Sequence, residues 1–461
     1  MKRTLLVLAL CVILGSLLGG GLARWGGRPV TEGSGPLPAT VPVPAGPGPI
    51  SPGGAEPAAP GREPVGEDDE SGSGRAPSGP DGQANPVDAV ALANNAFAFD
   101  LYRQLAKGEG NLFFSPYSLS SALAMVYGGA SGQTAAQLAQ ALHIELPNEA
   151  FHRAVSELAG TLQAPNDAYD LSVANALWGQ KGYPFRSEFL ELTSSYYQAG
   201  LHEVDYTSAS SREAARRAIN AWVEEQTQGK IRNLIQPEDL SDLTRLVLTN
   251  AIYFKGAWEA PFHPDATRPM PFHLAAGATV DVPTMHQSAD FLYAENETVQ
   301  VLELPYAGGK LSMVVVLPKE GGLQALEETI DPQQVQAWLA QGSKREVEVY
   351  LPRFTLAQRV VLNDVLQALG VVDAFDPTRA DFSGMAEDRD LYLSQVIHQS
   401  FIEVHEEGTE AAAATGIGMR ITSLPANPPP VFRVDRPFIF LIRDGSTGTI
   451  LFMGRVADPR G

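Results

Sequence analysis

Cysteine is almost absent from this 461-residue chain, which contains only Cys11. That residue lies in the leading hydrophobic stretch, so a mature domain released from the stretch would contain no thiol. Such a domain can form no disulfide bond and carry out no cysteine chemistry. Its fold must be held by packing, for which the 44% of apolar residues provide ample material.

Positive charge is also scarce. The chain has 33 Lys and Arg residues against 53 Asp and Glu, a formal net charge of −20, and no cluster of four or more basic residues. A strongly negative protein repels phosphate backbones and anionic lipid headgroups. We therefore expect no nucleic-acid partner and no heparin-type site.

The common motifs of hydrolases and nucleotide-binding enzymes are missing. There is no Gly-x-Ser-x-Gly, no His-Glu-x-x-His and no Gly-x-x-x-x-Gly-Lys-[Ser/Thr], and His405-Glu406-Glu407 lacks a second histidine. No set of His, Asp and Glu shows the spacing of metal ligands. We expect no enzymatic activity, no catalytic residue, no metal site and no cofactor.

The N-terminal segment, residues 1–23, has the pattern of an export signal. Lys2 and Arg3 precede an apolar run from Leu5 to Leu18, and small residues follow. Cleavage after Ala23 would release a secreted, extracellular protein. The alternative is an uncleaved anchor, because the apolar run continued to Leu22 has about the minimum length of a membrane span. Only in that case would the protein be tethered to the outer face of a membrane.

Residues 24–86 are rich in Gly, Pro, Ser and Ala and contain an acidic run at Glu67-Asp68-Asp69-Glu70. Such a segment buries too little apolar surface to offset its chain entropy. We expect a disordered, proline-extended linker. The remaining residues, 87–461, would form one large domain.

Hydrophobic periodicity predicts helices first and long strands later. Helical spacing covers 87–106, the segment that follows Ser115-Pro116 and precedes Gly128-Gly129, and 220–227. Strands are predicted at 246–254, 301–304, 312–317, 346–351, 432–434, 438–442 and 450–456. This order favours an α+β domain.

A specific pattern begins at Asn111. The stretch Asn-Leu-Phe-Phe-Ser-Pro-Tyr-Ser-Leu-Ser-Ser-Ala-Leu-Ala-Met, ending at Met125, is similar to the helix B region of the serpin family. Other short matches follow in order: Gly132, Thr134 and Gln137; Asn175-Ala176-Leu177-Trp178; Ile219-Asn220 with Trp222-Val223; Gly229-Lys230-Ile231; Thr249 to Gly256 with Trp258; Asp381 to Met385; and Val434 to Phe440. Each of these matches alone is weak evidence. Together, in order and spread over residues 90–457, they make the chain resemble a serpin.

The resemblance implies an α+β serpin fold, with helices around a large central β-sheet, smaller sheets and an exposed reactive loop. A serine protease would cut this loop and be trapped as a covalent 1:1 complex when the cut loop inserts into the central sheet. We expect a metastable monomer. The alternative is a non-inhibitory serpin-fold carrier, chaperone or storage protein.

A segment rich in alanine would be the hinge of this loop. It comprises Glu406, Glu407, Gly408, Thr409, Glu410, Ala411, Ala412, Ala413, Ala414 and Thr415. By propensity alone an alanine run favours a short exposed helix. Small side chains can nevertheless enter a packed sheet without overlap. At the two-residue period of a strand, Thr409, Ala411, Ala413 and Thr415 share one face, and Glu410 lies on the other.

By the same resemblance, a polar cluster called the shutter lies under the centre of the sheet. It would comprise Ser115, Ser118, Asn250 and His398, with His398 in a structural role. Trp258 would lie where the loop first enters, the breach, and Arg353 would pair with Glu406. If exposed, that pair would contribute under about 1 kcal/mol, so its role would be positional.

The resemblance implies Thr422-Ser423 as the reactive bond, because inhibitory serpins usually place the scissile residue fourteen positions after the hinge glycine, here Gly408. Thr422 implies an elastase-like or subtilisin-like target. Arg420 is an alternative that would suit trypsin-like enzymes with a shorter inserting segment. Leu424 is another, which would suit chymotrypsin-like enzymes, but Pro425 would then occupy the leaving-group side.

Overall fold

The computed structural model describes residues 85–164, 168–197, 200–319, 322–387, 390–409 and 428–461. These residues all belong to one compact unit, Arg75–Gly461. The expected signal (1–23) and nearly all of the expected linker (24–86) lie outside them. The same holds for hinge residues Glu410 to Thr415 and for Arg420, Thr422, Ser423 and Leu424. No helix among the described residues is long and apolar enough to cross a membrane.

The helices follow local sequence signals closely where a cap marks the start. Pro86 begins the first helix after Asn85, whose side chain accepts a hydrogen bond from the Val87 amide, and Ser115 caps the second in the same way. The helices are α1 Pro86–Leu105, α2 Pro116–Gly129, α3 Gly132–Ala141, α4 Asn148–Leu162, α5 Ser187–Tyr197, α6 Ala209–Gln226, α7 Leu323–Thr329, α8 Pro332–Gln341 and α9 Asn363–Ala368.

The helix predicted at 220–227 is longer at its N-terminal end. α6 begins at Ala209, capped by Ser208, and its first two turns are largely polar. Only Ala215, Ile219, Asn220 and Val223 are buried in it. The apolar periodicity of the first half is therefore too sparse to indicate a helix.

One sheet has six strands in the order β10-β11-β12-β4-β2-β3, with an additional pairing between β11 and β4. Its strands are β2 Tyr169–Gln180, β3 Leu201–Val204, β4 Leu246–Ala257, β10 Phe354–Val361, β11 Leu393–His405 and β12 Gly408–Thr409.

The other sheet has nine strands, in the order β1-β15-β14-β8-β7-β6-β9-β13, and β5 pairs with β6. The strands are β1 Leu112–Phe114, β5 Arg268–His273, β6 Thr279–Glu295, β7 Val299–Pro305, β8 Leu311–Pro318, β9 Ser343–Pro352, β13 Val431–Arg433, β14 Phe438–Asp444 and β15 Ile450–Val456. The strands expected in separate smaller sheets are joined because the 17-residue β6 pairs with β5, β7 and β9 along its length.

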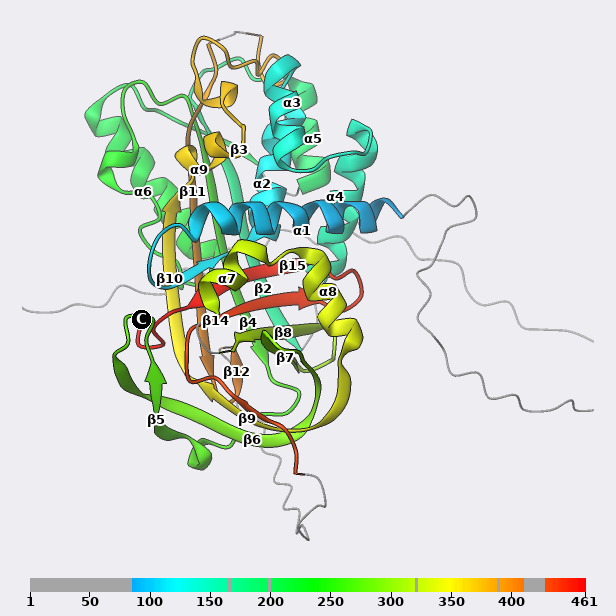
Figure 1. Cartoon of the computed structure of the whole chain (residues 1–461). Helices are drawn as coiled ribbons and strands as arrows, with labels where there is room; N and C mark the ends of the chain where they lie inside the picture. The colour runs from blue at the N-terminus through cyan, green and yellow to red at the C-terminus, as the bar shows by residue number, and fades with distance from the viewer. Residues whose placement is uncertain (1–84, 165–167, 198–199, 320–321, 388–389, 410–427) are drawn as a thin grey trace, which may run out of the picture. The chain divides into compact units, whose positions relative to one another are not determined.

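The six-stranded sheet is covered on both faces (Figure 1). On one face, Ile219 and Val223 of α6 pack against Val247 and Ala251 of β4 in one core cluster. On the other face, Leu246 and Leu248 of the same strand join a cluster that includes α2 and strands of the nine-stranded sheet. This arrangement confirms the α+β prediction.

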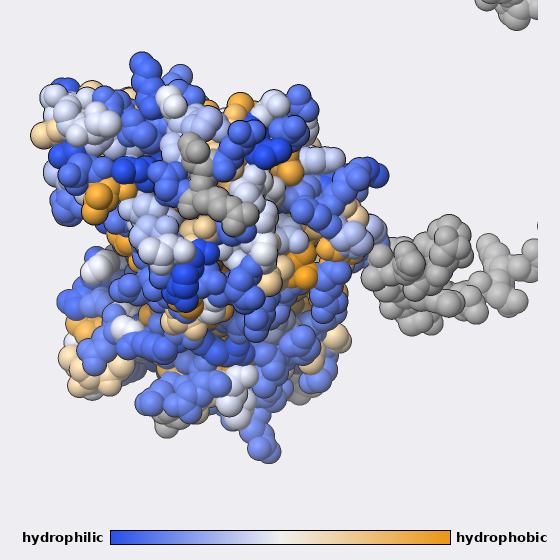
Figure 2. All heavy atoms as spheres, turned by 90° about the horizontal axis from the view of Figure 1, so that it is seen from above, coloured by the Kyte–Doolittle hydropathy of each residue, from blue (hydrophilic) through white to orange (hydrophobic). Residues whose placement is uncertain are grey.

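The outer surface is mainly hydrophilic on the face shown in Figure 2, where apolar side chains are scattered and not gathered into one patch. This agrees with the high content of acidic residues.

Candidate functional site

The centre of the six-stranded sheet is a parallel pairing. β11 and β4 run side by side from Leu393 opposite Leu246 to Phe401 opposite Tyr253. Beyond Tyr253 the two strands are separated by β12, which pairs antiparallel with both. The sheet is thus closed along most of this seam and open at one end.

The four predicted shutter residues meet on this seam and are all fully buried. His398 of β11 lies opposite Asn250 of β4, and its Nδ1 is hydrogen-bonded to Asn250 Oδ1. The Ser115 amide donates to His398 Nε2 at 3.2 Å, and Asn250 Nδ2 donates to Ser118 Oγ at 2.6 Å. Separating β4 from β11 must therefore break a buried side-chain network as well as a backbone ladder.

Asn175 is a further member that the sequence analysis did not single out. It lies on β2 directly opposite Asn250, accepts a hydrogen bond from Asn250 Nδ2, and donates to the Ser118 carbonyl at 3.2 Å. Ser118 Oγ also donates to Asn175 Oδ1 at 3.2 Å. The only signal in the sequence was its place in the motif Asn175-Ala176-Leu177-Trp178.

His398 is a neutral structural residue in this network. Burial lowers the pKa of His398 to about 3, although its bond to Asn250 acts in the opposite direction. Because the Ser115 amide donates to Nε2, the proton must lie on Nδ1 and is donated to Asn250. Ser115 Oγ donates to the Leu451 carbonyl at 2.6 Å, so Ser115 and His398 do not form a nucleophile–base pair.

The described part of the hinge forms a hairpin with β11. The chain turns at Glu406-Glu407, and Gly408 and Thr409 return as β12, opposite His405 and Val404 on one side and Ala257 and Gly256 on the other. Gly408 has φ 149°, and a Cβ there would lie 2.1 Å from the Gly256 carbonyl oxygen. Only glycine fits this position.

Trp258 fixes the turn of this hairpin. Its indole Nε1 donates to the His405 carbonyl and its amide to the Glu407 carbonyl, both at 3.0 Å. The Phe262 amide donates to the Glu406 carbonyl at 2.8 Å. Trp258 therefore lies at the end of the seam where β12 enters the sheet.

The Arg353–Glu406 pair is present, and it joins an exposed arginine to a buried carboxylate. Glu406 is 3% exposed, and Arg353 Nε donates to its Oε1 at 2.7 Å. Burial would raise the pKa of Glu406, but hydrogen bonds from Thr267 and Arg353 outweigh this effect and hold it below its usual value. Removing Arg353 would leave a buried carboxylate short of donors, so the small energy for an exposed pair does not apply.

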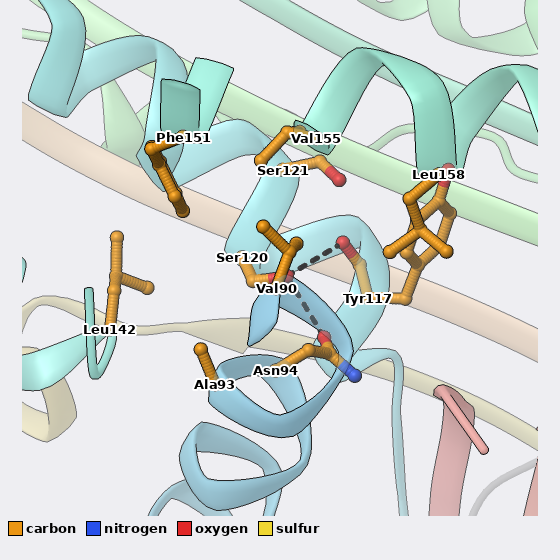
Figure 3. Close-up of a pocket in the computed structure, with 10 residues that line it drawn as sticks. All are labelled: Val90, Ala93, Asn94, Tyr117, Ser120, Ser121, Leu142, Phe151, Val155 and Leu158. Atoms are coloured by element: carbon orange, nitrogen blue, oxygen red, sulfur yellow. Dashed lines mark hydrogen bonds between the residues drawn. The ribbon is translucent and has the colours of Figure 1, made fainter. Parts of the chain in front are cut away.

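Two cavities in the described part of the chain have no Asp, Glu, Lys or Arg in their linings. A small apolar cavity of about 20 Å³ lies between α1, α2 and α4, next to Ser120, which donates to Asn94 Oδ1 (Figure 3). A larger one, about 360 Å³, includes Asn175 and Trp222 in its lining, and no Asp, Glu, Lys or Arg lines it. No group of three or more His, Cys, Asp or Glu among the described residues could hold a metal ion.

A sheet that is closed at its centre and already accepts an extra strand at one end is the arrangement expected of a serpin. Residues 92–459 match the family model described as serpin (serine protease inhibitor), and the chain belongs to this family.

Known relatives agree with this assignment. The leukocyte elastase inhibitor of Homo sapiens is 42% identical over 385 residues, which are 81% of this chain and all of the relative. The structure of Serpin48, a highly specific serpin of the insect Tenebrio molitor, has a TM-score of 0.72 and 37% identity and covers 80% of this chain and 98% of its own. The structure of human thyroxine-binding globulin complexed with thyroxine has a TM-score of 0.75 and 32% identity and covers 82% of this chain and 100% of its own.

The depressed pKa of His398 predicts a loss of stability in acid. The unfolded histidine binds a proton near its ordinary pKa of 6.5, whereas the folded one does so only near about 3. The unfolded state therefore holds more protons between these values, and stability falls as the pH falls through that window. We expect the urea midpoint to fall less between about pH 7.5 and about pH 4.5 in His398→Gln than in the wild type.

His263→Gln is the matched control, because the His263 side chain is 60% exposed. Burial also lowers the pKa of His152, to about 4, but this contribution is common to all three proteins. Equal pH slopes for His398→Gln and the wild type would contradict the assignment.

Proposed function

We propose that this serpin inhibits serine proteases as a suicide substrate. One observation carries the proposal: Gly408 and Thr409 already occupy the space between β4 and β11, in the uncleaved chain, as the beginning of an inserted strand. The similarity to leukocyte elastase inhibitors supports it. The partner is a serine protease, held covalently in a 1:1 complex with a monomer.

The protease supplies the catalytic groups for cleavage of the scissile bond. Its serine oxygen attacks the scissile carbonyl carbon, the peptide bond breaks, and the new amine leaves with a proton delivered by the protease's own histidine. The N-terminal part of the loop then carries the ester-linked protease with it as it inserts. A strand of about fourteen residues at ~3.3 Å each moves the protease by roughly 46 Å. Distortion of the protease active site prevents hydrolysis of the ester.

We extend the register of β12 to propose a path for the rest of the hinge. Each further residue along the hinge moves one residue back along β4 and β11. Continued in this way from Thr409, which lies opposite Gly256 and Val404, the strand would place Thr415 opposite Asn250 and His398. The hinge threonine would then enter the shutter at the point where the His398–Asn250 bond has to open.

Insertion is favourable because of the hydrogen-bond pattern. One parallel ladder between β11 and β4 would be replaced by two antiparallel ladders, and antiparallel pairing is slightly more stable per residue. Ala411 and Ala413 would lie opposite Phe254 and Ile252 of β4, where small side chains avoid overlap.

For the reactive bond we propose Thr422-Ser423. In the β12 register, residue 419 would lie opposite Leu246, the first residue of β4. The scissile residue would then lie just beyond the end of the strand, so that the bound protease remains outside the sheet. Arg420 and Leu424 remain the alternatives, and Thr422 implies a protease that accepts a small side chain.

A non-inhibitory role is the second candidate, because the chain is also similar to thyroxine-binding globulin, whose structure contains bound thyroxine. The small-residue hinge favours inhibition, since a carrier does not need to insert its loop. We further propose that residues 1–23 direct export and that residues 24–86 are a spacer.

The first test is complex formation. We expect an SDS-resistant 1:1 complex with subtilisin or pancreatic elastase, together with a released C-terminal peptide that begins at Ser423 in mass spectrometry. A peptide that begins at Ile421 would assign Arg420 instead. Cleavage by every protease tested, with no covalent complex, would contradict inhibition.

Thr409→Arg tests insertion itself. Thr409 is fully buried, and a cation in its place would cost several kcal/mol. We expect the number of inhibitor molecules consumed per trapped protease to rise at least about tenfold, whereas Thr409→Ser should behave like the wild type. Unchanged trapping by the arginine variant would rule out insertion at this position.

Cleavage of the loop should stabilise the protein. Insertion adds a strand to the centre of the sheet, and each kcal/mol gained raises the melting temperature by about 2–4 °C in a large domain. We expect an increase of about 10 °C or more, measured by calorimetry on intact and loop-cleaved protein. Equal melting temperatures would contradict the metastable state.

The spacer should be dispensable for inhibition. A variant that begins at Asn85 keeps the α1 cap and should trap protease at a rate within about twofold of the wild type. A variant that begins at Asp88 also loses the Asn85 cap and should be less stable by about 1 kcal/mol. Loss of inhibition in the first variant would show that the N-terminal segment takes part.

A further inference from the structure

Tyr306 lies directly behind the inserted hinge residues. It follows β7, forms an isolated bridge with Trp258, and is fully buried. Its ring stacks on Trp258 with centroids 4.6 Å apart, and it meets Phe254 edge to face at 5.0 Å. These contacts on two sides hold the phenol ring in one place.

The Tyr306 hydroxyl is hydrogen-bonded to Thr409 Oγ1 at 2.8 Å, and both side chains are fully buried. Burial raises the pKa of Tyr306 well above its usual value, although the Thr409 bond acts in the opposite direction, so the phenol stays neutral at physiological pH. This bond joins the turn after β7, in the nine-stranded sheet, to a hinge residue of the six-stranded sheet.

We propose that Tyr306 is a positioning residue for loop insertion, whose hydroxyl holds Thr409 in register between β4 and β11 before the loop is cut. The contact exists in the uncleaved chain, and its effect on trapping rests on the proposed inhibitory function.

Ordering of Thr409 would promote insertion because the first residues of an inserting strand are the hardest to place. The first residues to enter a sheet lose backbone freedom before many contacts offset that loss. Here Gly408 and Thr409 are already ordered, so insertion continues from an existing end. Trapping competes with hydrolysis of the acyl-enzyme. If loop insertion starts earlier, fewer inhibitor molecules are cleaved and released from the protease without trapping it.

Two substitutions remove the two halves of the bond with little change of shape, Tyr306→Phe and Thr409→Val. Tyr206→Phe is the matched control, because Tyr206 is also fully buried and its hydroxyl donates to the Trp178 carbonyl at 3.1 Å, away from the hinge. Thr409→Ser retains the hydroxyl. All are made in the full chain and tested with subtilisin and pancreatic elastase.

Hydrogen–deuterium exchange in the free protein, for peptides covering residues 404–409, measures the hinge directly. Loss of one hydrogen bond should raise exchange there by about two- to tenfold in Tyr306→Phe and in Thr409→Val. The number of inhibitor molecules consumed per trapped protease should increase in the same two variants. The double variant should show no more than the larger single effect, since both substitutions remove one bond.

Equal results for Tyr306→Phe and Tyr206→Phe in both measurements would overturn the assignment, as would additive effects in the double variant. Thr409→Ser should match the wild type if the hydroxyl is what matters. If the wild type traps no protease but Tyr306→Phe still raises the exchange, inhibition is wrong and the hinge contact stands.

Discussion

The parallel pairing of β4 with β11 is the contact on which the rest of the structure depends. Its two faces are covered by α6 and by the core that contains α2, so its closed state is well packed. In the inhibitory function proposed above, the same pairing is the one that an incoming strand would separate. Parallel pairing is slightly less stable per residue than antiparallel pairing, and the buried bond between His398 and Asn250 would add a local cost to its opening.

The sequence predicted the features that depend on local chemistry. Asn85-Pro86 and Ser115-Pro116 are caps followed by helix-compatible prolines, and both helices begin where these signals lie. The family resemblance pointed to Ser115, Ser118, Asn250 and His398, and the structure brings all four together in one buried hydrogen-bond network. Local chemistry was misleading in α6, whose polar first half is helical because the second half anchors it to the sheet.

Contacts between distant residues could be predicted only where the family resemblance supplied both partners, as for Arg353 and Glu406. Tyr306 and Thr409 are 103 positions apart, and nothing near either residue indicates the other. Asn175 belongs to a sequence motif, but nothing in that motif indicated that it would pair with Asn250 across β2 and β4. The burial of Glu406 also escaped prediction, because an acidic residue in a charged turn is usually exposed. Arg353 was the expected partner of Glu406, but the second donor, Thr267, was not expected.

Ser115 connects the two sheets through one residue. Its amide is bonded to His398 at the seam, and its hydroxyl is bonded to the Leu451 carbonyl in β15 of the other sheet. If the loop inserts as proposed, the new strand would join the six-stranded sheet alone. Ser115 would then keep β11, on one side of the opening, attached to β15 of the nine-stranded sheet while β4 separates from it.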